Sequence, residues 1–312
     1  MTQSSRQRDC VHAELTRLLD PTLGPLGKPP REVEAFLTED LRDEVAEEYR
    51  AMSPDAPADG RAAIITAGPP GAGKSTALDV LLDEHRRIDP DAVKDLLLGR
   101  LEAAGLLEVR HGFSLLDGQP VRPGELAWWV HRASTDVADL VRLTSLARGE
   151  NFAMEGTLVW DEIVGQYNGE LLRSGYETLI VLDVEVSLPV AIEQARQRWW
   201  QGRGDLTGVG GRFVPDAVVA AFYPDNSKVS VCATRAREMY SEANDSGITT
   251  TLALESRGIS GARSAALLRP TGDVEAWRGL TLAAVCVRCG SRLTGKRSIN
   301  RGLGEECHRH TL

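Results

Sequence analysis

Residues 68–75 form the segment whose chemistry is most specific in this sequence. They read Gly-Pro-Pro-Gly-Ala-Gly-Lys-Ser and match the pattern G-x-x-x-x-G-K-[ST] without a gap. The glycines let the backbone curl so that its N–H groups face phosphate oxygens, while Lys74 suits the β- and γ-phosphates of ATP and the Ser75 hydroxyl suits Mg²⁺. A glycine-rich turn that contains a lysine without this function is the alternative. The residues expected to bind ATP and Mg²⁺ are Gly68, Pro69, Pro70, Gly71, Ala72, Gly73, Lys74, Ser75 and Thr76.

This motif requires a strand before it and a helix after it. Short apolar runs typical of buried parallel strands are residues 62–67, 151–155, 178–184 and, more weakly, 249–254. Helices are predicted from about Lys74 and at residues 31–50, 128–148 and 188–201. Strands that alternate with helices predict an α/β fold with a doubly wound parallel sheet, of the P-loop kinase-like class.

Two carboxylates follow what reads as a second short strand. Asp89 and Asp91 are expected near the carboxyl edge of the sheet, where α/β proteins bind their ligands. A kinase that acts on a hydroxyl needs a carboxylate there to orient the acceptor oxygen and take its proton. The structural alternative makes Asp89 a helix N-cap, Pro90 the first helical residue and Asp91 a favourable charge in the first turn. The local sequence leaves both interpretations open.

Five elements in order resemble the zeta toxin family. They are GPPGAGKST (68–76), IDPDAVK (88–94), GENFAMEGT (149–157), an arginine-bearing helix after TLIVLDVEVSLP (178–189), and GGRFVP (210–215). Zeta toxins are bacterial P-loop kinases of toxin–antitoxin systems, and characterised members phosphorylate the amino-sugar 3′-hydroxyl of UDP-N-acetylglucosamine. The resemblance covers roughly residues 30–250. It implies an ATP-dependent kinase with a nucleotide-sugar substrate and an antitoxin protein as a candidate partner.

The resemblance also implies roles for single residues. Asp91 matches the family's proposed general base, and Asp89 supports the turn before it. Glu155 and Thr157 fall where the family contacts the nucleotide sugar. Asp139, on the intervening helix, falls where a substrate-binding glutamate can occur.

Arginines are expected to neutralise the transferring phosphate, because phosphoryl transfer spreads charge over the equatorial oxygens. The resemblance implies that role for Arg212 and for a second arginine on the preceding helix, where Arg196 fits without a gap. Arg198 and Arg203 are the alternatives, and ordinary solvated helix positions are the structural interpretation of Arg196 and Arg198. The glycine-rich residues 202–211 predict a mobile loop that closes on ATP.

Cysteines near the C-terminus have the spacing of a metal site rather than of a disulfide framework. Two pairs at such spacing predict a structural Zn²⁺ site with no open position. The expected ligands are Cys286, Cys289, Cys307 and His310. His308 is the alternative fourth ligand, and a disordered tail with reduced thiols is the alternative to a metal site.

The totals fit a soluble globular protein. The chain has 312 residues, of which 42% are hydrophobic, and a net charge of −9, which counts against a nucleic-acid partner. No stretch approaches the ~20 apolar residues of a membrane span, and residues 1–8 are polar and do not resemble a secretory signal, so a cytoplasmic location is expected. The predicted parts are a helical flank (1–60), the P-loop kinase domain (61–255), a linker or extra elements (256–284) and a zinc-bound module (285–312).

Three functions compete on the sequence alone. The first is a nucleotide-sugar kinase that acts as a toxin. The second is a kinase of another hydroxyl, such as that of an antibiotic, a small metabolite or a polynucleotide end. The third is a nucleic-acid-binding or adaptor protein that uses the zinc module, with the P-loop domain as a switch, and the acidic charge of the chain counts against it.

Overall fold

The computed structural model describes residues 3–52, 56–58, 60–79, 81–82, 84–205, 208–224, 227–257, 263–268 and 274–275. The chain divides into two compact units, which are described separately. The helical unit comprises Met1–Ser53, Asp89–Val141 and Gln194–Asp216. The sheet unit comprises Pro54–Ile88, Arg142–Glu193 and Ala217–Leu312.

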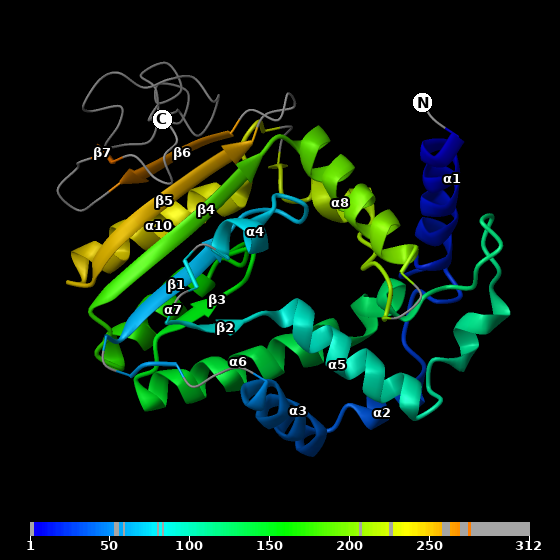
Figure 1. Ribbon diagram of the computed structural model, residues 1–312, viewed down its shortest axis with the longest axis horizontal. Helices are drawn as coiled ribbons and strands as arrows, with labels where there is room; N and C mark the ends of the chain where they lie inside the picture. The colour runs from blue at the N-terminus through cyan, green and yellow to red at the C-terminus, as the bar shows by residue number, and fades with distance from the viewer. Residues whose placement is uncertain are drawn as a thin grey trace. The chain divides into compact units, whose positions relative to one another are not determined.

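The sheet unit is built on a sheet that has, among the described residues, seven strands in the order β2-β3-β1-β4-β5-β6-β7 (Figure 1). The strands from β2 to β5 in this order pair in parallel, and β6 and β7 are antiparallel additions. Their bounds are β1 Ala62–Ala67, β2 Arg86–Ile88, β3 Phe152–Met154, β4 Thr178–Val186, β5 Thr249–Arg257, β6 Arg263–Leu268 and β7 Val274–Glu275. The predicted parallel α/β sheet is therefore confirmed, while the antiparallel strands β6 and β7 were not predicted.

Strand β1 lies in the middle of the parallel strands, between β3 and β4. All of its residues after Ala62 are buried, because helices cover both faces of such a sheet. The register pairs Ile65 with Met154 and Ala67 with Asp183. The segments that follow β1 and β3 therefore leave the sheet side by side at its carboxyl edge, where α/β proteins bind their ligands.

The helices of the sheet unit are short or amphipathic. They include α4 Lys74–Leu78, α7 Ile163–Arg173 and α10 Val231–Asp245, and α9 Asp216–Ala220 begins at the unit boundary. Helix α10 packs against β4, β5 and α7 (Figure 1), and its apolar side chains, among them Met239 and Ala236, are buried there.

The helical unit holds most of the remaining helices. They are α1 Gln3–Leu18, α2 Arg31–Phe36, α3 Glu39–Ala51, α5 Pro90–Ala103 and the 3₁₀ helices η1 Glu108–Gly112 and η2 Pro123–Val130. Helices α6 His131–Arg148 and α8 Leu188–Arg203 contribute residues to both units. No helix in the described ranges is long and apolar enough to cross a membrane.

The single helix predicted over residues 31–50 is wrong, because two helices occupy that segment. Helix α2 ends at Phe36, and α3 starts at Glu39. The Thr38 hydroxyl accepts a hydrogen bond from the Leu41 N–H over 3.2 Å and so caps α3. Apolar spacing that continues across Thr38 suggested one helix, while the capping threonine starts a second one.

Candidate active site

The glycine-rich loop after β1 has backbone angles that only glycine adopts without strain. Gly68, Gly71 and Gly73 have φ values of 141°, 83° and 88°. At Gly68 a Cβ atom would also lie 2.3 Å from the Val184 carbonyl oxygen, so the loop approaches β4 too closely for any side chain. The loop joins β1 to α4, which is the strand–loop–helix context predicted for it.

Lys74 is the first residue of α4, and its ammonium group turns back over the loop. Its Nζ donates to the carbonyl oxygens of Gly68 over 2.8 Å and Pro69 over 3.1 Å. The cation is therefore held beside the curled backbone, which is the arrangement that places a lysine against the phosphates of a nucleotide.

The segment after β3 is hydrogen-bonded to the end of β1 and to the loop. The Thr66 hydroxyl accepts from the Gly156 N–H over 2.9 Å and donates to the Gly156 carbonyl oxygen over 3.1 Å. The Gly68 N–H donates to the Thr157 carbonyl oxygen over 3.3 Å. The segment Glu-Gly-Thr at 155–157 thus packs against the start of the glycine-rich loop.

Glu155 reaches the loop with its side chain. It is 5% exposed, and its Oε2 accepts a hydrogen bond from the Ser75 hydroxyl over 2.7 Å. Its Oε1 accepts from Arg87 Nε over 2.5 Å. Hydroxyl and carboxylate oxygens are the ligands that Mg²⁺ prefers, and P-loop proteins pair the loop hydroxyl with an acidic residue to hold this ion. Ser75 and Glu155 therefore fit a magnesium site, whereas the sequence had assigned Glu155 to the acceptor.

In the helical unit, Asp91 lies in the first turn of α5. Asp89 is the N-cap and accepts the Asp91 N–H over 2.8 Å, and Pro90 is the first helical residue. Lys94 donates to Asp91 Oδ1 over 2.9 Å, and Arg198 Nη2 lies 3.3 Å from Asp91 Oδ2. Asp91 thus lies in the first turn of a helix, as the structural interpretation of the sequence predicts. It also lies among cations, which that interpretation does not require.

Arg212 joins the same group of charges. Its Nη2 donates to the Asp91 carbonyl oxygen over 2.8 Å and to Asp95 Oδ2 over 2.5 Å, and its Nη1 lies 3.7 Å from Asp91 Oδ2. Lys94 closes the element IDPDAVK but was given no role there, and no motif singled out Asp95, although the three- and four-residue spacing from Asp91 places both on one face of α5. We call Asp91, Lys94, Asp95, Arg198 and Arg212 the Asp91 cluster.

The charges of this cluster set the protonation of its members. Burial favours the neutral form of Asp91, but Lys94 and then Arg212 outweigh it and lower the pKa of this carboxyl group. Burial raises the pKa of Asp95, against the opposing effect of Arg212. Burial and the nearby Lys94 lower the pKa of His131, the first residue of α6. Asp91 is therefore ionised and His131 neutral near pH 7.

The structure does not bring Arg196 to the Asp91 cluster. Its Nε donates to Asp216 Oδ1 over 3.0 Å, its Nη2 pairs with the other Asp216 oxygen, and its Nη1 lies 3.4 Å from Asp9 on α1. Two nitrogens of the Arg196 guanidinium bind the two oxygens of the Asp216 carboxylate. This bidentate pair connects α8 to the first residue of α9.

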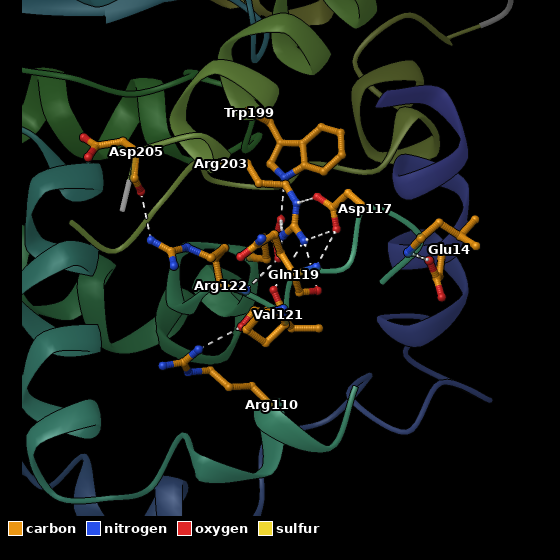
Figure 2. Close-up of polar contacts among 12 residues, drawn as sticks. Glu14, Arg110, Asp117, Gln119, Val121, Arg122, Trp199, Arg203 and Asp205 are labelled. Carbon is orange, nitrogen blue, oxygen red and sulfur yellow. Dashed lines mark hydrogen bonds and ion pairs between the residues drawn. The ribbon is translucent and has the colours of Figure 1, made fainter. Parts of the chain in front are cut away.

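Arg203 is committed to a buried network in the helical unit (Figure 2). Its Nη1 lies 2.6 Å from Glu125 Oε1 and its Nε 2.7 Å from Asp117 Oδ2, and Trp199 donates to the same Glu125 oxygen over 2.8 Å. The side chains of Arg203 and Glu125 are 2% and 0% exposed. Arg203 is therefore a structural residue of this network.

The loop predicted over residues 202–211 starts later than expected, because α8 continues through Arg203. A Cβ atom on Gly202 would lie 2.7 Å from Gly211 Cα, and one on Gly211 would lie 2.0 Å from the Trp199 carbonyl oxygen. These two glycines serve close backbone packing against the end of α8. This packing fixes the position of Gly211, the residue before Arg212. Gly202 and Gly211 are therefore needed for close packing and not for the mobility that the sequence predicted.

The remaining predicted residues are placed as follows. Asp139 lies half-buried on α6 in the helical unit. The expected zinc ligands Cys286, Cys289, Cys307 and His310 lie outside the described residues. Within the described part of the chain, no group of three or more His, Cys, Asp or Glu side chains could hold a metal ion.

The sheet order and the glycine loop after β1 define the class of the fold, a P-loop α/β protein of kinase-like topology. No curated protein matches the chain. A family model described as a family of unknown function (DUF6011) matches residues 282–311.

Solved structures share parts of the fold. One is the complex AvrRxo1-ORF1:-ORF2 with ATP, with 15% identity and a TM-score of 0.47 over 76% of this chain and 68% of that chain. Another comes from the PezAT chromosomal toxin–antitoxin system of Streptococcus pneumoniae, with 12% identity and a TM-score of 0.47 over 72% and 81%. A putative kinase from Chloroflexus aurantiacus has 20% identity and a TM-score of 0.37 over 52% and 78%. Similarity at this level assigns no activity to the chain.

Proposed function

We propose that this protein is an ATP-dependent kinase that phosphorylates a hydroxyl of a nucleotide sugar, the 3′-hydroxyl of the amino sugar of UDP-N-acetylglucosamine, and acts as the toxin of a toxin–antitoxin system. The observation that carries the proposal is the Asp91 cluster, an ionised carboxylate with two arginines, in a chain that also has the phosphate-binding loop. The identity of the acceptor comes from the resemblance to zeta toxins.

The glycine-rich loop binds ATP, the phosphate donor. The backbone N–H groups of Gly71, Gly73, Lys74 and Ser75 and the Lys74 ammonium would bind the phosphates of ATP, and Ser75 with Glu155 would hold the metal. Mg²⁺ held there would neutralise charge on the phosphate oxygens of ATP. Glu155 is buried, and its Oε2 faces Ser75 instead of solvent.

Asp91 serves the acceptor. In the transfer, a bond forms between the acceptor oxygen and the γ-phosphorus, the bond from that phosphorus to ADP breaks, and the hydroxyl proton passes to Asp91. A carboxyl group with a lowered pKa is a weak base, but a loose phosphoryl-transfer transition state needs orientation more than early proton removal. Because Asp91 is ionised, it is ready to accept the hydrogen bond that orients the hydroxyl.

Arg212 and Arg198 neutralise the transferring group. Both contact the Asp91 carboxylate, and the side chain of Arg198 is 59% exposed, so its guanidinium is accessible to a ligand. Arg196 was the expected second arginine, and its pairing with Asp216 and Asp9 favours a supporting role for it instead.

The experiment is mass spectrometry of ATP and a panel of nucleotide sugars after incubation with the protein. We expect a mass increase of one phosphate on UDP-N-acetylglucosamine with wild type and none with Lys74→Ala. Phosphate transfer to another class of hydroxyl, with no nucleotide sugar modified, would refute the assigned acceptor.

The C-terminal segment adds a structural part to the proposal. Cys286, Cys289, Cys307 and His310 would bind one Zn²⁺, on the basis of their paired spacing. We expect about one zinc per chain by elemental mass spectrometry of the purified protein. Metal content that is unchanged by Cys286→Ser would contradict these ligands.

A further inference from the structure

Arg87, on β2, lies between two carboxylates beside the predicted metal site. Its Nε and Nη2 pair with Glu155 Oε1, the former over 2.5 Å, and its Nη1 lies 3.0 Å from Asp79 Oδ1. The side chain of Glu155 is 6% exposed, that of Arg87 32% and that of Asp79 56%. No sequence motif singles out Arg87, and none of the roles described above uses it.

Through Asp79, Arg87 also contacts the end of helix α4. Asp79 is the C-cap of α4, the helix of five residues that begins with Lys74 and Ser75. So short a helix has few internal hydrogen bonds, and its direction depends on its surroundings. Arg87 connects the end of this helix to Glu155, whose other oxygen is bonded to Ser75 near its start.

The chemistry of a buried carboxylate requires a partner of this kind. An ionised carboxylate removed from water is costly unless a cation or several donors compensate it. Nε and Nη2 of Arg87 both meet the one oxygen Oε1, so two N–H donors hold this oxygen at fixed angles and leave Oε2 to Ser75. Partners behind a ligating carboxylate orient it, and losing one typically lowers metal affinity by about 10- to 100-fold.

We propose that Arg87 is a positioning residue for the Mg²⁺ site, which holds Glu155 turned toward Ser75 while it ties α4 to the sheet. The inference rests on the proposed function and adds a residue to its metal site. Arg87 acts through Glu155 and does not touch the phosphates.

The test is a titration of a fluorescent ATP analogue into the full chain, first with chelator and then at increasing Mg²⁺. In Arg87→Ala we expect the Mg²⁺ concentration for half-maximal enhancement of binding to rise about 10-fold or more, with metal-free affinity unchanged. Arg87→Lys keeps the positive charge but loses the guanidinium. Its Mg²⁺ concentration for half-maximal enhancement should lie between those of wild type and Arg87→Ala. Arg100→Ala, which removes an exposed arginine of α5 paired with Glu48, is the matched control.

Two outcomes would overturn this inference. Weaker metal-free binding in Arg87→Ala means that Arg87 contacts the phosphates directly. A lower melting temperature with an unchanged Mg²⁺ requirement means that its role is structural only. A wild-type chain that binds no nucleotide refutes the proposed function itself, which separates the two failures.

Discussion

Asp89 and Asp91 lie two residues apart at the start of α5, and the structure gives them different tasks. The Asp89 side chain accepts a backbone N–H of the first turn, whereas the Asp91 side chain meets Lys94 and Arg198. Capping needs only a short acceptor, while the group around Asp91 concentrates charge that a cap does not need.

Substitution should separate these two tasks. We expect Asp89→Ala to lower the free energy of unfolding by ~1 kcal/mol and to retain most of the turnover. Asp91→Ala should reduce phosphoryl transfer by about 100-fold or more, because it removes the group that orients the hydroxyl. Turnover assays and urea unfolding measure both effects. Near-normal turnover in Asp91→Ala would remove the assigned base.

Two carboxyl groups at the end of β4 make stability depend on pH. Burial raises the pKa of Asp183 to about 6, and burial together with the Asp183 charge raises the pKa of Glu185 to about 8. The native state then binds these protons more tightly than the unfolded chain does. This contribution to stability is complete below the unfolded values near pH 4 and is lost as the pH rises through 6 to 8.

The variant Glu185→Gln keeps an oxygen acceptor for Ser230 and does not titrate. Its free energy of unfolding should fall less between pH 6 and pH 8 than that of wild type, on the order of 1 kcal/mol for each pKa unit involved. Denaturant unfolding at three pH values measures the slopes, with the exposed Glu177→Gln as control. Equal slopes in wild type and Glu185→Gln would contradict the assigned protonation.

At the scale of elements, helix α8 distributes its arginines among different neighbours. Arg196 pairs with Asp216, and Arg198 pairs with Asp91. Arg203 pairs with Glu125 and, as Figure 2 shows, with Asp117. Helical geometry spreads these side chains around the axis, so each meets a different segment.

Arg198 and Arg203 should therefore respond oppositely to truncation. Arg203→Ala leaves the buried Glu125 and the partly buried Asp117 without their cation and should cost about 3–5 kcal/mol of stability. Arg198→Ala removes an exposed ion pair worth about 1 kcal/mol or less, yet should lower the transfer rate about 100-fold. Unfolding and turnover measured on both variants decide this. A stable Arg203→Ala or a fully active Arg198→Ala would contradict the division.

The segment before Arg212 depends on a glycine for contact with α8. Because a Cβ atom on Gly211 would lie 2.0 Å from the Trp199 carbonyl oxygen, Gly211→Ala should force the backbone apart and cost about 1–3 kcal/mol. Turnover should fall with it, since Arg212 is the next residue. Gly208→Ala, where a Cβ atom meets nothing within 4 Å, is the matched control in turnover and unfolding assays. Equal behaviour of the two variants would refute the packing role.

On the scale of the whole molecule, the proposed toxin activity predicts an effect on cells. Expression of the intact chain in bacteria should arrest growth, because phosphorylated nucleotide sugar is withdrawn from its normal use. Lys74→Ala and Asp91→Ala should each relieve the arrest at equal protein level, and Arg100→Ala should not. Growth curves with immunoblots measure this, and arrest that persists in Lys74→Ala would exclude phosphoryl transfer as its cause.

The sequence by itself determined the parallel sheet and the loop after β1. Both are local: a short apolar run fixes a buried strand, and the glycines at positions 68, 71 and 73 fix a turn with φ angles that only glycine adopts without strain. Local signals also offered Asp89 as an N-cap and Pro90 as the first helical residue, one of two interpretations left open by the sequence, and α5 does start in this way.

Tertiary structure decided which distant residues meet. Glu155 reaches Ser75 because β3 pairs with β1 in one register, and a pattern within either strand carries no information on that register. The choice of Arg198 over Arg196 as the neighbour of Asp91 depends on where Asp216 and Asp91 come to lie, each remote in sequence from α8. Local propensity sets elements, whereas long-range contacts set the partners of their side chains.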